Sequence, residues 1–138
     1  MRYGWKRLIL IDTNIFLELL LGQSKAEDCA KLLNRVSKGE IEAVVTRFTI
    51  HAVEAVVNNG NLIADFLRNI ENSLGLSVYE TSISEETAIS ILMSKINRDF
   101  DDTLQYFVAK ILGAESIVSF DKHFDGLDIQ RKEPKDYL

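Results

Sequence analysis

Cysteine and proline are almost absent from this 138-residue sequence, which has one of each and seven glycines. The single thiol, Cys29, cannot form an intrachain disulfide, and a cysteine-based zinc site needs more than one. So few prolines and glycines also argue against long disordered or low-complexity stretches. We therefore expect one domain over residues 1–138, long enough to bury a real core.

Long hydrophobic runs are missing as well. The basic N-terminus leads into a short apolar run that Asp12 interrupts, whereas a signal peptide needs a longer run and a small-residue cleavage site. Later apolar runs are too short to cross a bilayer, so we expect a cytoplasmic protein. The net charge of −5 argues against nonspecific coating of nucleic acid but does not exclude an enzyme that cuts it.

Three short apolar segments with β-branched residues stand out, at residues 8–11, 43–45 and 116–118. None alternates cleanly, which is typical of strands buried on both faces of a parallel sheet. Weaker candidate strands lie at residues 76–79 and 127–130. Because helical patterns lie between these segments, we expect an α/β sandwich with a mainly parallel sheet.

The helical patterns carry start and stop signals. A capping box at Ser24–Glu27 predicts a helix that continues to Gly39, and a second box at Ser82–Glu85 predicts a helix to about residue 95. Further helices are expected over residues 48–57 and 62–73. The last long helix is expected to begin near Asp101 or Asp102 and to end at Gly113.

Acidic residues follow the ends of the predicted strands. Asp12 comes directly after residues 8–11, and Asp121 follows residues 116–118 closely; residues 43–45 lead into the helix that carries Glu54. Asp102 lies in the first turn of the last long helix. Because parallel strands end at one edge of a sheet, we expect these carboxylates to meet there. Clustered carboxylates bind hard divalent cations, which assist phosphodiester hydrolysis.

Each residue also has an ordinary structural interpretation. Asp12 could cap the following helix, and a capping role is favoured for Asp101. Glu54 could belong to a solvated stripe with His51, and Asp121 to a turn. His51 and His123 have no metal-ligand spacing, so surface or packing roles are favoured. Ser119 could orient a carboxylate or simply end a strand. Lys31, Arg35 and Lys38 are interpreted as a solvated helix face.

These segments together resemble the PIN-domain family. Ile9–Asn14 resembles the first family motif, an apolar strand followed by Asp-Thr-Asn. Asp102-Thr103-Leu104 with Ala109 resembles the motif at the third acid, and Ser119–Phe124 resembles the fourth. Glu133-Pro134 resembles the end of many members. The second family acid would fall at Ala52 when counted from Thr46, so Glu54 departs from the pattern by two positions.

The resemblance implies a PIN-like three-layer α/β/α sandwich with a central, mainly parallel five-stranded sheet. It also implies a Mg2+- or Mn2+-dependent endoribonuclease that cuts RNA, with Asp12, Glu54, Asp102 and Asp121 as catalytic and metal-binding residues. Many small members are toxins of VapBC-type toxin–antitoxin pairs, so an antitoxin protein and a homodimer are possible partners. Two alternatives stay open: a PIN-fold interaction module that lost catalysis, and a response-regulator receiver, which the acid spacing disfavours.

Overall fold

The structure, a computed structural model, describes residues 7–138. The basic segment before Arg7, on which the signal-peptide argument partly rests, lies outside this range. A five-stranded sheet forms the centre, with the order β3-β2-β1-β4-β5 and parallel pairing throughout. Its strands are β1 Leu8–Ile11, β2 Glu42–Thr46, β3 Leu76–Tyr79, β4 Ser116–Val118 and β5 Gln130–Lys132. The predicted mainly parallel five-stranded sheet is confirmed.

The fifth strand differs from its prediction. Residues 127–130 have the apolar content of a strand, but the strand is Gln130–Lys132, and its register pairs Ser116 with Gln130. Leu127 and Ile129 instead pack against the buried cluster beneath the sheet, ahead of the strand. The apolar content of residues 127–130 indicates that this segment packs against the core, but it does not indicate which residues pair with β4.

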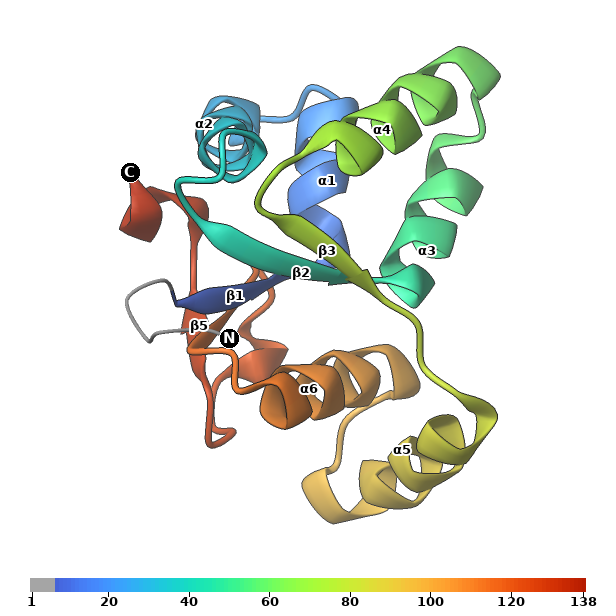
Figure 1. The fold of residues 1–138 in the computed structure, drawn as a ribbon. Helices are drawn as coiled ribbons and strands as arrows, with labels where there is room; N and C mark the ends of the chain where they lie inside the picture. The colour runs from blue at the N-terminus through green and yellow to red at the C-terminus, as the bar shows by residue number, and fades with distance from the viewer. Residues whose placement is uncertain (1–6) are drawn as a thin grey trace.

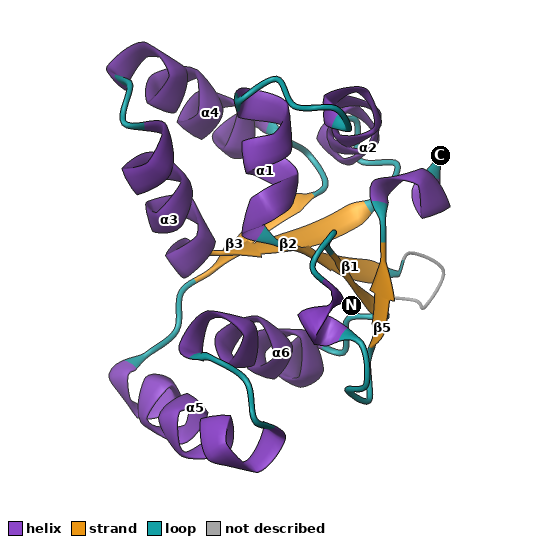
Figure 2. Ribbon diagram, turned by 180° about the vertical axis from the view of Figure 1, so that it is seen from behind, coloured by secondary structure: helices purple, strands orange, loops and turns teal. Residues whose placement is uncertain are grey.

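Side chains alternate across the sheet and divide the core into two layers. Ile9, Ile11 and Val45 lie in the cluster that also contains residues of helices α1 (Thr13–Leu20), α2 (Ala26–Ser37), α3 (Arg47–Val57) and α4 (Gly60–Asn72). Leu10 and Ile117 lie in the cluster that contains residues of helices α5 (Ile83–Ile96) and α6 (Phe100–Leu112). Figures 1 and 2 show these helices on opposite sides of the sheet. All five residues are fully buried, so the predicted three-layer α/β/α sandwich is confirmed.

The helices follow the predicted pattern closely. They are α1 Thr13–Leu20, α2 Ala26–Ser37, α3 Arg47–Val57, α4 Gly60–Asn72, α5 Ile83–Ile96 and α6 Phe100–Leu112, with short 3-10 turns η1 Lys122–Phe124 and η2 Pro134–Tyr137. The capping box of Ser82 and Glu85 is confirmed. The one predicted from Ser24 is wrong: the N-cap of α2 is Lys25, without a side-chain cap bond. The Lys25 amide donates instead to Glu18 Oε2 of α1, at 2.8 Å.

The strand order reverses at β1. From β1 the chain moves outward to β2 and β3, then returns to the other side of β1 with β4 and β5. The carboxyl ends of β1 and β4 therefore flank the point where the order reverses, the usual ligand site of open α/β sheets. Across residues 7–138 we find no helix long and apolar enough to span a membrane.

Candidate metal centre

Asp12 lies directly after β1, at the point where the strand order reverses. It is only 5% exposed, and its extended backbone makes it the N-cap of α1. The Thr13 amide donates to Asp12 Oδ1 at 2.7 Å. The capping interpretation of Asp12 is therefore confirmed, and the cap bond engages Oδ1 only.

Ser119 ties the ends of β1 and β4 together. Its hydroxyl donates to Asp12 Oδ2 at 2.8 Å, and it accepts from the Asp121 amide at 2.9 Å. Asn14 Nδ2 donates to Asp12 Oδ2 at 3.1 Å and to Ser119 Oγ at 3.0 Å. Ser119 is fully buried. Of its two predicted roles, the structure shows the contact with a carboxylate, that of Asp12.

Burial raises the pKa of Asp12 to about 7. The loss of hydration is the largest cause; the hydrogen bond from Ser119 and the one from the Thr13 amide lower the pKa, while the charges of Asp101 and Asp102 raise it further. Desolvation thus contributes more to the raised pKa of Asp12 than repulsion by neighbouring carboxylates does. Within residues 7–138, no cation is among the main causes of the shift in the pKa of Asp12.

Asp102 contributes from the first turn of α6. It is 7% exposed, and its pKa rises to about 6, mainly through burial and then through the charges of Asp99, Asp121 and Asp101. The cap of α6 is Asp99, which accepts from the Asp102 amide at 2.9 Å. The capping role favoured for Asp101 is therefore wrong.

Asp101 turns inward instead. Its Oδ1 accepts a 3.3 Å hydrogen bond from Gln105 Nε2, and burial is the main reason that its pKa is raised. α6 begins one residue earlier than expected because Asn97, in a left-handed conformation, ends α5 and Asp99 is extended. Asp101 thus lies in the first turn, one position before Asp102.

Asp121 and His123 approach Asp102 from the loop after β4. The His123 amide donates to Asp121 Oδ1 at 2.9 Å, and His123 Nδ1 lies 3.1 Å from the same oxygen. Nδ1 is also 3.7 Å from Asp102 Oδ2. One ligand atom from each of the three residues lies within 4.8 Å of the others, so the structure joins Asp102 and Asp121 and adds a histidine.

The structure does not bring Glu54 into this group. Glu54 is half-buried on α3 and contacts His51 Nδ1 at 2.9 Å. The face of α3 toward Asp12 carries Thr49, whose Oγ1 lies 2.9 Å from Thr13 Oγ1. Ala52 follows Thr49 by one turn, whereas Glu54 is rotated about 140° from Thr49.

Gln105 is a site residue that the sequence analysis missed. It is fully buried, and its Nε2 donates to Thr49 Oγ1 at 2.6 Å and approaches Asp12 Oδ1 at 3.4 Å. Its Oε1 has no hydrogen-bond partner among the described residues. A buried amide oxygen without a partner is costly in a finished fold. The atom that contacts Asp12 and Asp101 is Nε2, not this oxygen.

The donor set fits a hard divalent cation. Carboxylate oxygens of Asp102 and Asp121 lie within 4.8 Å of each other, and the charge of Asp102 reaches Asp12. Divalent ions of the Mg2+ and Mn2+ class prefer such ligands. Burial is the main cause of the raised pKa values of Asp12 and Asp102, and neighbouring carboxylates raise both further; a bound cation would oppose these effects.

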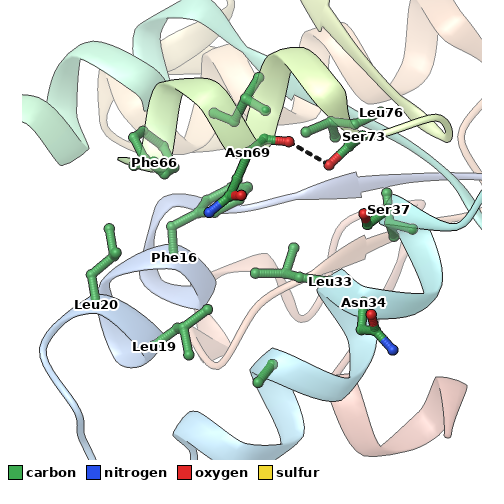
Figure 3. Close-up of a pocket in the computed structure, with 13 residues that line it drawn as sticks. Phe16, Leu19, Leu20, Leu33, Asn34, Ser37, Phe66, Asn69, Ser73 and Leu76 are labelled. Atoms are coloured by element: carbon green, nitrogen blue, oxygen red, sulfur yellow. Dashed lines mark hydrogen bonds between the residues drawn. The ribbon is translucent and has the colours of Figure 1, made fainter. Parts of the chain in front are cut away.

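A separate cavity between α1, α2 and α4 has different chemistry. Its volume is about 240 Å³, and Figure 3 shows that apolar side chains such as Phe16, Leu33 and Phe66 dominate it, with Asn69 among them. No acidic or basic residue lines it. This cavity is therefore not the metal centre.

Comparison with known proteins agrees with this architecture. One similar solved structure is VapC20 of Mycobacterium tuberculosis, described as a sarcin-ricin loop cleaving toxin, with 15% identity, a TM-score of 0.67, and coverage of 82% of this chain and 89% of that one. Another is VapBC2 of Rickettsia felis bound to a DNA fragment from their promoter, with 12% identity, a TM-score of 0.66, and coverage of 91% and 98%.

At these identities the likeness to solved structures shows the fold alone, and no curated protein matches the chain in sequence. The family comparison is more specific, because the model of the PIN domain matches residues 9–130. That range contains both core layers and all the acids of the reversal point. The chain belongs to the PIN-domain family.

Proposed function

We propose that this protein is a divalent-metal-dependent endoribonuclease that hydrolyses RNA phosphodiester bonds. The observation that carries the proposal is the approach of Asp102 and Asp121, with ligand atoms within 4.8 Å of one another, beside the buried Asp12, which shares Ser119 with Asp121. Two of the three have carboxyl pKa values raised to about 7 and about 6. Perturbed carboxylates in a crevice are a physical indication of a functional site.

In this proposal Asp12, Asp102 and Asp121 hold Mg2+ or Mn2+. When bound, the cation supplies a Lewis acid that polarises the phosphodiester and activates water. Ser119 and Asn14 fix the orientation of Asp12 through its Oδ2, as supporting hydrogen bonds to ligating carboxylates commonly do. Glu54, the fourth acid expected from the sequence, contacts His51. Whether Glu54 contributes to metal binding is tested by mutation in the Discussion.

RNA is the proposed substrate because the fold is similar to that of an RNA-cleaving toxin. VapC20 is described as a sarcin-ricin loop cleaving toxin, and its structural likeness to this chain supports an RNA substrate here. Its identity of 15% is too low to transfer the target, so the proposal names the class of substrate and not the sequence.

The test is cleavage of RNA by purified protein with Mn2+, with Mg2+ and with chelator. We expect Asp12→Asn to lower the rate by at least about 100-fold, the cost of losing one electrostatic group at a transition state. Asp65→Asn is the matched control, since Asp65 is an exposed acid on α4 that pairs with Arg68. Full activity in Asp12→Asn, or in chelator, would overturn the proposal.

One observation favours a second candidate, a PIN-fold interaction module without turnover. Glu54 is turned away from the other acids, and Ala52 stands where the family acid was expected. A module of this kind would show no RNA cleavage with either metal in the intact, folded protein. A crystal structure determined in Mn2+ would then show no ion beside Asp102 and Asp121.

We further propose that the chain is the toxin of a VapBC-type pair and forms a homodimer. The fold shared with VapC20 and VapBC2 supports the first part. Exposed apolar side chains on α3 and α5 support the second: Val56, Ile83 and Ile91 are 57%, 83% and 61% exposed. Co-purification with the product of a neighbouring gene tests the antitoxin. Sedimentation of wild type and Val56→Glu tests the dimer.

A further inference from the structure

We propose that His123 is a nitrogen ligand of the bound cation, so that the centre is a mixed carboxylate–imidazole site. This inference rests on the proposed function, because it assumes that Asp102 and Asp121 hold a metal. It makes a distinct claim: His123 moves the preference of the site from Mg2+ toward first-row transition ions.

The distances match those expected around one ion. Two neighbouring ligands of an octahedral cation with ~2.1 Å bonds lie ~3 Å apart. His123 Nδ1 lies 3.1 Å from Asp121 Oδ1 and 3.7 Å from Asp102 Oδ2. One ligand atom from each of the three residues lies within 4.8 Å of the others.

The backbone of His123 is held on both sides while its ring stays accessible. Its amide donates to Asp121 Oδ1, and its carbonyl accepts from Arg98 Nε at 2.6 Å. The side chain is nevertheless 74% exposed. Burial therefore does not dictate the direction of the ring toward two carboxylates, and substitution of the ring should leave the fold intact.

An imidazolium acting only as counter-ion would give similar geometry without metal. The two roles separate when a cation binds. A counter-ion is repelled by the incoming charge, whereas a ligand forms a bond through its ring nitrogen. Mg2+ strongly prefers oxygen ligands, while affinity for nitrogen ligands rises from Mn2+ toward Co2+ and Ni2+.

The test uses pulsed EPR of Mn2+ bound to the intact protein, read without any activity measurement. We expect nuclear modulation from a directly bound imidazole nitrogen. Because the chain has only two histidines, labelling with [15N]histidine should convert the 14N pattern to a 15N pattern. His123→Gln should abolish it. His51→Gln is the matched control and should retain it, since His51 contacts Glu54 away from Asp102 and Asp121.

Calorimetry with Co2+ and Mg2+ provides the second readout. Because it removes a ligand, His123→Gln should weaken Co2+ binding at least about tenfold. This is the lower bound seen for supporting residues of metal sites. Mg2+ affinity should change much less. Mn2+ binding without a nitrogen signal, or equal losses for Co2+ and Mg2+, would overturn the role of His123 and leave the metal centre standing. No Mn2+ binding at all would overturn both.

Discussion

At the scale of the residue, buried carboxylates control how stability depends on pH. Asp102 has its pKa raised from 3.8 to about 6, chiefly by burial, so the native state holds a proton that the unfolded state has already released. Between these two values stability falls as pH rises. The stabilisation is fully present below about pH 4 and is lost above about pH 6, while Asp12 extends the fall to about pH 7.

Asp102→Asn should therefore stabilise the metal-free protein at pH 8, by about 1–3 kcal/mol, and change little near pH 4. Asn removes the charge and keeps the shape, and within residues 7–138 no hydrogen bond to the Asp102 carboxylate is lost. Urea unfolding in chelator at both pH values measures the difference. Asp28→Asn, on α2, serves as the control. An equal effect at both pH values would contradict the electrostatic explanation.

Ala52 and Glu54 allow a test of which position on α3 serves the site. Ala52 follows Thr49, which contacts Gln105 beside Asp12, whereas Glu54 contacts His51. We expect Ala52→Glu to strengthen Mn2+ binding by about tenfold, because affinity grows with the number of charged ligands. Glu54→Gln should leave it within about twofold. A large loss in Glu54→Gln would instead restore the assignment made from the sequence.

Sequence reasoning located the acids that closely follow a predicted strand. Asp12 and Asp121 could be placed because each closely follows a strand, and parallel strands end at a common edge. Gln105 could not, because its partners Thr49 and Asp12 lie 56 and 93 positions away. The sequence analysis considered only the spacing between His123 and His51. The spacing that matters is the one between His123 and Asp121, two residues earlier, because these two residues lie together in the structure.

At the scale of the element, Arg98 joins the α5–α6 turn to the loop of Asp121 and His123. Its guanidinium donates to the carbonyls of Ile96 and Asn97 and to those of His123 and Asp125. One side chain thus positions η1 against the start of α6, which carries Asp102. Arg98 is a positioning residue, since it reaches the centre only through the backbone of this loop.

Arg98→Met should lower stability by about 1–3 kcal/mol, the usual value of hydrogen bonds to a charged group, and weaken Mn2+ binding. Hydrogen exchange should accelerate at the amides of His123 and Asp125, which bond within this loop. Arg68→Met is the control, because Arg68 forms only an exposed pair with Asp65 among its described contacts. Unchanged exchange in η1 would show that Arg98 does not hold it.

The boundaries of helices and strands were predictable where the residues that set them belong to the same element. The capping box of Ser82 and Glu85 is formed by residues three positions apart and was recognised. The start of α2 was not, because the acceptor for the Lys25 amide comes from Glu18 of another helix. The start of β5 was also missed, since only pairing with β4 sets its register.

At the scale of the molecule, strand order creates the site. Alternating strands and helices predicted a parallel sheet, but they did not specify the order β3-β2-β1-β4-β5. That order places the ends of β1 and β4 side by side, so residues 107 positions apart, Asp12 and Ser119, share a hydrogen bond. The two layers of helices then exclude water from Asp12 and raise its carboxyl pKa.

Because the site exists only in the folded chain, a cation should stabilise the whole molecule by mass action. At 100 times its dissociation constant, Mn2+ should add about 2.7 kcal/mol, which raises the Tm of a domain this size by roughly 8 °C. Differential scanning calorimetry at pH 8, with chelator as reference, measures the shift. Asp121→Asn should lose most of it, since this variant keeps the core but removes a proposed ligand. An equal shift in Asp121→Asn would place the stabilising ion elsewhere.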